Sequence, residues 1–195
     1  MPRVGILGLQ GDTAEHAEVL RRLGAQPVEV RSPKDLADVG GLVLPGGESP
    51  AQSRLLERAN LAEAIRRRAH AGMPLLGTCA GLILLAREVT GGPVRTLELM
   101  DIAVVRNAYG RQRESFEAEV WVRDLSPPPL RVAFIRAPLI TRVGPEVEVL
   151  AAFEGHPVLV RQGPWLGATF HPEITGEVRL HQLFLAQLEA LGQGS

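Results

Sequence analysis

The sequence is poor in cysteine and has no long hydrophobic run, and both absences narrow what the chain can be. Its 195 residues include one cysteine, which excludes an internal disulfide framework and is typical of a reducing compartment. No segment approaches the roughly 18 consecutive apolar residues that a membrane-spanning helix needs. The first apolar run, residues 4–9, is too short for the core of a secretory signal. We therefore expect a cytoplasmic protein without a membrane partner.

The chain also has no large excess of charge of either sign. The formal net charge is −1 at pH 7, so no overall field attracts nucleic acid or an anionic membrane surface. Hydrophobic residues make up 45% of the chain and charged residues 22%, which is ordinary for a globular protein. A chain of this length can bury a sizeable core without disulfides or metals. We expect a single domain over residues 1–195 and no nucleic-acid partner.

Apolar runs alternate with helical patterns through the first half of the chain. The sequence predicts buried strands at residues 4–9, 28–30, 41–44 and 75–76. Asp12-Thr13-Ala14-Glu15 has the layout of a capping box and predicts a helix that ends at Gly24. Residues 52–71 predict two helical pieces with a break near Asn60. Strands and helices that alternate in this way favour a parallel sheet covered on both faces.

The second half is richer in β-structure. The sequence predicts strands at residues 119–122, 131–135, 147–153, 158–161 and 166–170. A final helix is predicted over residues 177–191, with an apolar stripe of Leu180, Leu183, Phe184, Leu188 and Leu191. We expect an α/β fold, a flavodoxin-like three-layer sandwich. Its central sheet would be mostly parallel, with helices on both faces and an antiparallel β extension from the second half.

The single cysteine lies in a segment typical of a nucleophile. Cys79 is the centre of Gly77-Thr78-Cys79-Ala80-Gly81, between the expected strand and an apolar run at residues 82–86. A nucleophile between glycines at a strand-to-helix junction is the nucleophile-elbow pattern, with cysteine in place of serine. The N–H groups of the following helix favour the thiolate. A lone cysteine is otherwise a buried structural residue, and the glycines favour the nucleophile.

Loops after the predicted strands point to one shared crevice. In open α/β sheets, ligands bind beyond the carboxyl ends of the strands, where Gln10-Gly11, Pro45-Gly46-Gly47-Glu48-Ser49 and the elbow would meet. The N–H groups of Ala80 and Gly47 are candidate oxyanion-hole donors. The glycine pair is alternatively a tight turn or a phosphate cradle. Because no Walker lysine follows it, we discount the phosphate cradle.

One histidine is placed to act as a base. His171 ends a predicted strand, and Pro172 biases it toward extended backbone. Residues two apart in an extended chain point to the same side, so Glu173 can face the imidazole. A carboxylate there would fix the tautomer and stabilise the imidazolium. The alternative is a surface His-Pro-Glu turn; the elbow in the same chain favours catalysis.

The other histidines carry no catalytic motif. His70 and His181 are expected to be solvated on helices, His16 lies in the first turns of a helix, and His156 lies in a hairpin turn. Because these residues are scattered and there is no second cysteine, we predict no metal site. No cofactor is predicted.

Together these motifs resemble the class I, or triad, glutamine amidotransferases. Within that superfamily the chain is similar to the glutaminase subunits of pyridoxal 5′-phosphate synthase. The similarity covers nearly the whole chain, in residues 5–11, 15–16, 44–49, 77–81, 106–112, 115–117, 134–138 and 170–173. Residues 106–112 and 134–138 are typical of this family rather than of triad glutaminases at large. The chain departs from the family at Asp12-Thr13, where a small and an aromatic residue are commoner, at Pro50 and at Ile174.

The resemblance implies a role for each matching residue. Cys79 would be the nucleophile, His171 the base and acid, and Glu173 the orienting carboxylate. Contacts to glutamine are implied for Gly47, Glu48, Ser49, Arg106, Ile135 and Arg136. Arg106 suits the α-carboxylate of glutamine, and Glu48 suits its α-ammonium group. Without the matching motif, Arg106 and Arg136 would each be interpreted as a solvated surface side chain.

The resemblance also implies an activity and a partner. Such a protein hydrolyses L-glutamine to L-glutamate and ammonia, and passes the ammonia to a (β/α)₈-barrel synthase subunit in a large hetero-oligomer. The Gln10 region would help to complete the oxyanion hole when the partner docks.

Two other functions stay open at this point. One is a hydrolase or deglycase that has an elbow cysteine and works without a partner. Residues 106–112 and 134–138 argue against this function. The other is a non-catalytic regulatory subunit that keeps the elbow only as a fold element; the intact Cys79, His171 and Glu173 speak against it.

Overall fold

The computed structural model describes residues 1–108 and 114–192. Within these residues, the main sheet has seven strands in the order β10-β11-β12-β4-β3-β1-β2. In chain order these strands are β1 (Arg3–Leu7), β2 (Gln26–Val30), β3 (Gly41–Leu44), β4 (Leu75–Thr78), β10 (Glu148–Phe153), β11 (His156–Gln162) and β12 (Trp165–Ala168). Strands β2, β1, β3, β4 and β12 run parallel, and β11 and β10 continue the sheet in antiparallel pairing.

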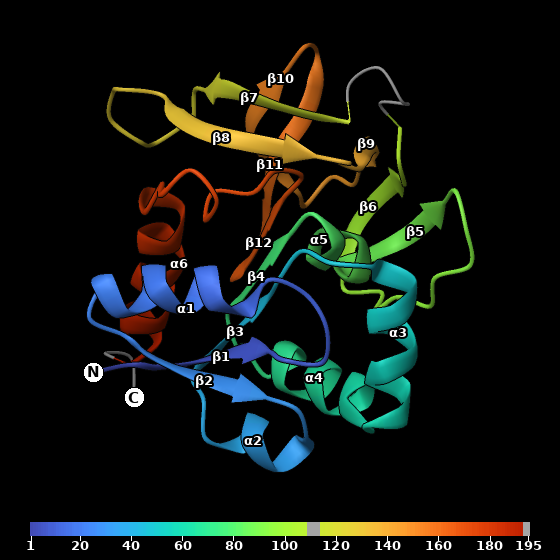
Figure 1. Ribbon diagram of the computed structural model, residues 1–195, viewed down its shortest axis with the longest axis vertical. Coiled ribbons are helices and arrows are strands. Elements are labelled where there is room, and N and C mark those ends of the chain that lie inside the picture. The colour runs from blue at the N-terminus through green and yellow to red at the C-terminus, as the bar shows by residue number, and fades with distance from the viewer. Residues whose placement is uncertain (109–113, 193–195) are drawn as a thin grey trace.

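Helices cover both faces of this sheet (Figure 1). On one face lie α1 (Thr13–Arg22) and α6 (Arg179–Gly192), which pack into one hydrophobic cluster with Leu20, Leu180 and Phe184. The helices of the other face are α2 (Pro33–Ala37), α3 (Ser49–Arg58), α4 (Leu61–His70) and α5 (Ala80–Leu85). The expected α/β architecture with helices on both faces is therefore confirmed.

The strand sequences explain why the sheet has two cores. Leu42 and Leu44 of β3 enter the cluster beneath α2–α5, whereas Val43 between them enters the cluster beneath α1 and α6. Leu75 and Leu76 of β4 divide in the same way. Successive side chains of a strand point to opposite faces, so a continuous apolar run is what a strand buried on both faces requires.

Two smaller sheets come from the second half of the chain. One pairs β5 (Ala86–Thr90), β6 (Met100–Val105) and β9 (Leu139–Val143), and the other pairs β7 (Ser115–Val120) with β8 (Leu130–Ile135). Figure 1 shows β7 and β8 crossing the end of the molecule beside β10 and β11. Aromatic contacts join this region to the main sheet: Phe116, Phe134 and Phe153 are stacked on one another, and Phe170 meets Phe134 edge-on.

Several boundaries differ from the sequence predictions. The predicted break near Asn60 is confirmed, since Asn60 has φ +56° between α3 and α4. The prediction contained neither α2 nor β5, β6 and β9. β5 is short and carries the exposed Arg87 and Glu88, so its sequence lacks a clear apolar alternation. No helix in the described residues is long and apolar enough to cross a membrane.

Candidate active site

The predicted crevice exists at the carboxyl ends of adjacent parallel strands. β12, β4, β3 and β1 are neighbours in the sheet, and the segments that follow them open onto a cleft of about 620 Å³. Every residue proposed from the sequence, except Glu173, lines this cleft: Gln10, Gly47, Glu48, Ser49, Cys79, Ala80, Arg106, Ile135, Arg136 and His171. Glu173 lies behind His171 and contacts its ring.

Cys79 has the geometry of a nucleophile elbow. Its φ is +51°, a backbone conformation that L-residues rarely adopt and that costs energy. The turn is held because the Cys79 N–H donates to the Ala168 carbonyl of β12 at 2.9 Å. A Cβ at Gly81 would overlap the Leu44 carbonyl, so only glycine lets α5 leave this close to β3. The sulfur lies 3.6 Å from the Ile135 carbonyl.

His171 is fixed through both its backbone and its ring. Its N–H donates to the Ala133 carbonyl of β8 at 2.7 Å and its carbonyl accepts from the Ala133 N–H at 3.3 Å. The Nδ1–H donates to Glu173 Oε1 at 2.5 Å, which leaves Nε2 for the sulfur. A Cβ at Gly46 would overlap the imidazole, so this loop approaches the ring because it lacks a side chain.

The electrostatic surroundings favour a protonated imidazole. Burial lowers the pKa of His171, but the neighbouring side chains of Asp12, Cys79 and Glu173 outweigh burial and raise it to about 12. Cys79 and His171 line the same cleft. The site therefore has the pairing that a thiolate–imidazolium nucleophile requires.

Asp12 has a different place from the one predicted. It occupies the N-cap position of α1, but among the described residues its side chain makes no capping hydrogen bond, so the capping-box prediction was wrong. Its Oδ2 lies instead 3.5 Å from His171 Nδ1. The spacing of Asp12 and Glu15 gave the sequence signal of a cap, which hid this contact with the imidazole.

Two buried histidines lie beneath the candidate triad. His16 of α1 and His181 of α6 are fully buried, and His16 Nδ1 lies 2.9 Å from His181 Nε2. His16 Nε2 lies 3.3 Å from Thr78 Oγ1 and 3.7 Å from Glu173 Oε1. The prediction that His181 is solvated was therefore wrong. Burial lowers the pKa of His16 to about 4 and, with the charge of His16, that of His181 to about 3, so both rings are neutral.

These contacts also correct the view that the histidines are scattered. One ligand atom each from Asp12, His16 and Glu173 lies within 4.8 Å of the others, a spacing that a metal ion can bridge. Two of these residues already have hydrogen-bond partners, however: His16 pairs with His181, and Glu173 accepts from His171. These groups therefore already belong to a buried hydrogen-bond network.

The expected oxyanion loop is held by glutamines. The Glu48 N–H donates to Gln10 Oε1 at 2.8 Å, so the Gln10 side chain rests on the Gly47–Glu48 peptide. Gln52 Nε2 donates to the carbonyls of Gln10 and Pro45 at 3.0 and 3.1 Å. Through Gln52, a fully buried side chain, the loops after β1 and β3 are joined. Gln52 carries no signal in the sequence, because no motif surrounds it.

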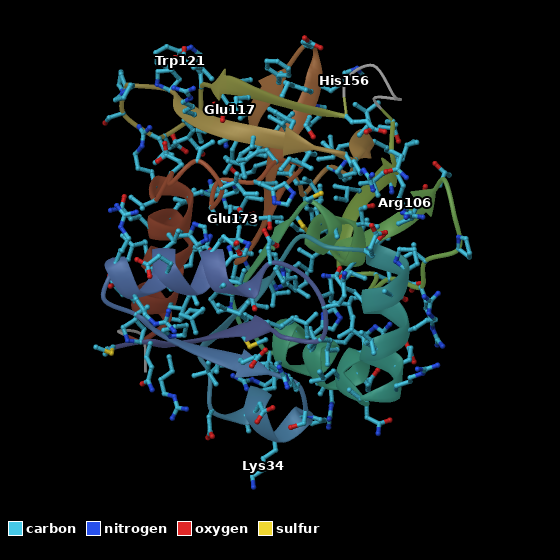
Figure 2. The ribbon with its side chains drawn as sticks, in the orientation of Figure 1. Lys34, Arg106, Glu117, Trp121, His156 and Glu173 are labelled. Carbon is cyan, nitrogen blue, oxygen red and sulfur yellow. The ribbon has the colours of Figure 1, made fainter. Side chains whose placement is uncertain are left out.

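The residues expected to bind glutamine form the outer part of the cleft. Ser49 is buried at the start of α3, whereas Glu48 is exposed. Arg106 follows β6, and its Nη1 donates to the Gly91 carbonyl at 3.3 Å; Figure 2 shows it near the edge of the molecule, with Glu173 in the interior. Arg136 has φ +46° and its N–H donates to the Glu114 carbonyl at 2.6 Å. Residues 109–112 of the resembling segment 106–112 lie outside the described residues.

Comparisons with known proteins agree on one family. A model of the SNO glutamine amidotransferase family matches residues 6–190. A protein of Frankia casuarinae named pyridoxal 5′-phosphate synthase subunit PdxT is 52% identical over 195 residues, which cover 99% of this chain and 98% of the relative. A protein of the same name from Methanothrix thermoacetophila is 49% identical over 95% of this chain and 99% of its own length.

Solved structures show the same fold. A glutamine amidotransferase superposes with a TM-score of 0.91 at 45% identity, covering 95% of this chain and 98% of its own. The PurLQS structure from Thermotoga maritima gives a TM-score of 0.68 at 20% identity over 96% of this chain and 99% of its own. At that identity the second likeness concerns the fold alone.

Proposed function

Since the chain belongs to the SNO glutamine amidotransferase family, we propose that it is a glutaminase that hydrolyses L-glutamine to L-glutamate and ammonia for pyridoxal 5′-phosphate synthesis. The observation that carries the proposal is that Cys79 and His171 line one cleft at the ends of β4 and β12, with Glu173 hydrogen-bonded to the His171 ring. Its close relatives are named as subunits of pyridoxal 5′-phosphate synthase.

In the first half of the reaction, the Cys79 sulfur bonds to the side-chain amide carbon of glutamine. The C=O electron pair moves to oxygen, and the N–H groups of Gly47 and Ala80 bind this oxyanion. The imidazolium of His171 then gives its Nε2 proton to the amide nitrogen. The C–N bond breaks, ammonia leaves, and a thioester between Cys79 and the glutamyl group remains.

In the second half, neutral His171 removes a proton from water. The resulting hydroxide attacks the thioester carbon, the C–S bond breaks, and glutamate leaves with the thiolate–imidazolium pair restored. Glu173 keeps Nδ1–H facing away from the sulfur throughout, because it accepts that proton in a hydrogen bond of 2.5 Å.

The outer part of the cleft carries the groups that match the amino-acid end of glutamine. The guanidinium of Arg106 binds the α-carboxylate, and Glu48 binds the α-ammonium group. Ser49, Ile135 and Arg136 complete the pocket. Recognition and chemistry would thus use opposite ends of the same substrate.

The ammonia passes to a partner rather than to water. Ammonia in bulk water at neutral pH takes up a proton and loses its nucleophilic lone pair, so a useful transfer needs a docked acceptor site. We assign that site to a (β/α)₈-barrel synthase subunit in a large hetero-oligomer. Docking would act on the Gln10 side chain that rests on the Gly47–Glu48 peptide, and so complete the oxyanion hole.

Glutamate release tests the proposal directly. The wild-type chain is assayed with L-glutamine, with and without the synthase subunit. The variants Cys79→Ala and Cys79→Ser are assayed in the same way, and Cys79→Ser keeps the size of the side chain. Turnover should appear only for the wild-type chain with the partner. Wild-type rates of glutamate release by Cys79→Ala would overturn the assignment.

A further inference from the structure

We propose that Asp12 is a second positioning residue for His171, and that its carboxyl group shares one proton with Glu173. The proposal rests on the glutaminase function proposed above, and it adds to the expected triad a member that follows a different strand. Asp12 comes from the loop after β1, whereas Glu173 follows β12.

The first observation is the direction of the Asp12 side chain. An aspartate at an N-cap ordinarily accepts hydrogen bonds from the first turn of its helix. In the described residues Asp12 makes no such bond, and its Oδ2 lies 3.5 Å from His171 Nδ1. Instead of capping α1, Asp12 faces the same imidazole nitrogen that Glu173 contacts at 2.5 Å.

The second observation is a set of carboxyl oxygens without donors. Both oxygens of Asp12 and Oε2 of Glu173 are buried, and within the described part of the chain they have no hydrogen-bond partner. Oxygens of these two groups lie within 4.8 Å of each other. Two ionised carboxylates so close would repel and leave their acceptors unsatisfied. A proton on one of the two groups removes the repulsion between like charges and supplies an O–H donor at the site.

The surroundings decide which group holds the proton. The Glu173 side chain is completely buried, and burial raises its pKa to about 7, with the neighbouring Asp12 carboxyl group acting in the same direction. Burial also acts to raise the pKa of Asp12, but the neighbouring side chains of His171 and Glu173 lower it overall. Asp12 also stands at the N-terminus of α1, where the helix dipole favours a negative charge.

Each element packed against the carboxyl pair contributes a titratable group that affects where the proton lies. α1 supplies His16, α6 supplies His181 behind it, and the elbow supplies Cys79; both histidines are neutral because burial lowers their pKa values. The charged residues that line the open side of the cleft are Glu48, Arg106, Glu114 and Arg136. The carboxyl pair with its one proton therefore carries a single negative charge against the imidazolium of His171.

A protonated carboxyl group near neutral pH is directly observable. Infrared spectra of the full-length chain are compared for wild type, Asp12→Asn and Glu173→Gln, with Asp38→Asn and Glu146→Gln as controls at exposed positions. At about pH 6, where ordinary carboxyl groups are ionised, wild type and both controls should show a carboxylic-acid C=O band. The band should be absent in Asp12→Asn and in Glu173→Gln, and in wild type it should vanish as the pH rises through about 7.

Kinetics with the synthase subunit give the second readout. Because either carboxylate can hold Nδ1–H, each single variant should lose about 10-fold in kcat, and Asp12→Asn/Glu173→Gln about 1,000-fold, more than the product of the two. A wild-type spectrum without the band, or a band that survives in Asp12→Asn, overturns the shared proton. Multiplicative losses overturn the joint positioning role. Neither result touches the proposed function, which is tested separately by glutamate release from the wild type and from Cys79→Ala.

Discussion

The inner and outer parts of the cleft are built on opposite principles. The inner part holds Cys79, His171 and Glu173 on the ends of neighbouring strands, and these side chains are almost entirely buried. The outer part holds Glu48, Arg106 and Arg136 on connecting loops, where the side chains are partly or fully exposed. The inner groups follow strands of the main sheet, whereas the outer groups lie on connecting loops that hydrogen bonds hold together.

This difference separates chemistry from recognition. Groups that exchange protons must keep their geometry within fractions of an ångström, and strand ends packed between α1, α5 and α6 provide this rigidity. Groups that grip the charged end of an amino acid can reach it on flexible stems, because ion pairs tolerate a range of geometries. Variants of the inner part should therefore change kcat, and variants of the outer part should change KM.

The largest effect should come from the imidazole. His171→Ala removes the group that stabilises the thiolate and protonates ammonia, so kcat for glutamate release should fall about 10⁴-fold. His156→Ala, an exposed histidine on β11, should match wild type. Equal losses in both variants would contradict the special position of His171.

The second-largest effect on the rate should come from Gly46, which lies against the imidazole of His171. A Cβ at Gly46 would overlap the ring of His171, and a displacement of about 1 Å costs about 100-fold in rate. Gly46→Ala should therefore lower kcat with little change in KM. Gly192→Ala, whose Cβ would meet open space, is the control. A rise in KM alone would show that Gly46 acts on substrate binding rather than on the imidazole.

Arg106 tests the outer part. Arg106→Met removes a charge-assisted hydrogen bond worth about 2 kcal/mol, so KM for glutamine should rise about 30-fold while kcat stays nearly constant. Arg22→Met, at an exposed position in the last turn of α1, should leave both constants unchanged. A fall in kcat without a change in KM would break the comparison between the two parts.

The smallest effect concerns stability rather than rate. His181 has a folded-state pKa of about 3 because it is buried, below the unfolded value of about 6.5. Its neutral form stabilises the fold fully above pH 6.5, and this contribution is lost as the pH falls toward 3. At pH 5 the loss is about 2 kcal/mol. His181→Gln keeps a hydrogen-bonding group without titrating, so urea unfolding should show a smaller decrease in stability from pH 7 to pH 5, by about that amount. The same decrease in the variant as in wild type would contradict the neutral pair.

The elements that the sequence predicted well are those with a strong local signal. The elbow around Cys79 is marked by its glycines, the His171–Glu173 pair by alternation next to a proline, and the break at Asn60 by a change in helical pattern. Each of these is set by neighbours in the chain. The parallel strands were predictable because a short continuous apolar run between turn residues is typical of a strand buried on both faces.

The residues that the sequence misplaced depend on distant contacts. Asp12 has the local pattern of a helix cap, and only the approach of His171 across the sheet turns it away from α1. His181 is polar, yet Leu185 one helical turn later is buried with it, and Leu191, which was assigned to the apolar stripe, is exposed. The hydrogen-bond partner of His181, His16, lies in another helix. No local rule brings α1 and α6 together.

Covalent labelling tests the central claim, that Cys79 is a nucleophile activated by His171. The chain with its synthase subunit is treated with a diazo ketone analogue of glutamine and examined by peptide mass spectrometry. The account predicts one label, on the peptide that contains Cys79, suppressed by excess L-glutamine and absent in His171→Ala. Active protein without label at Cys79, or equal labelling of His171→Ala, would contradict it.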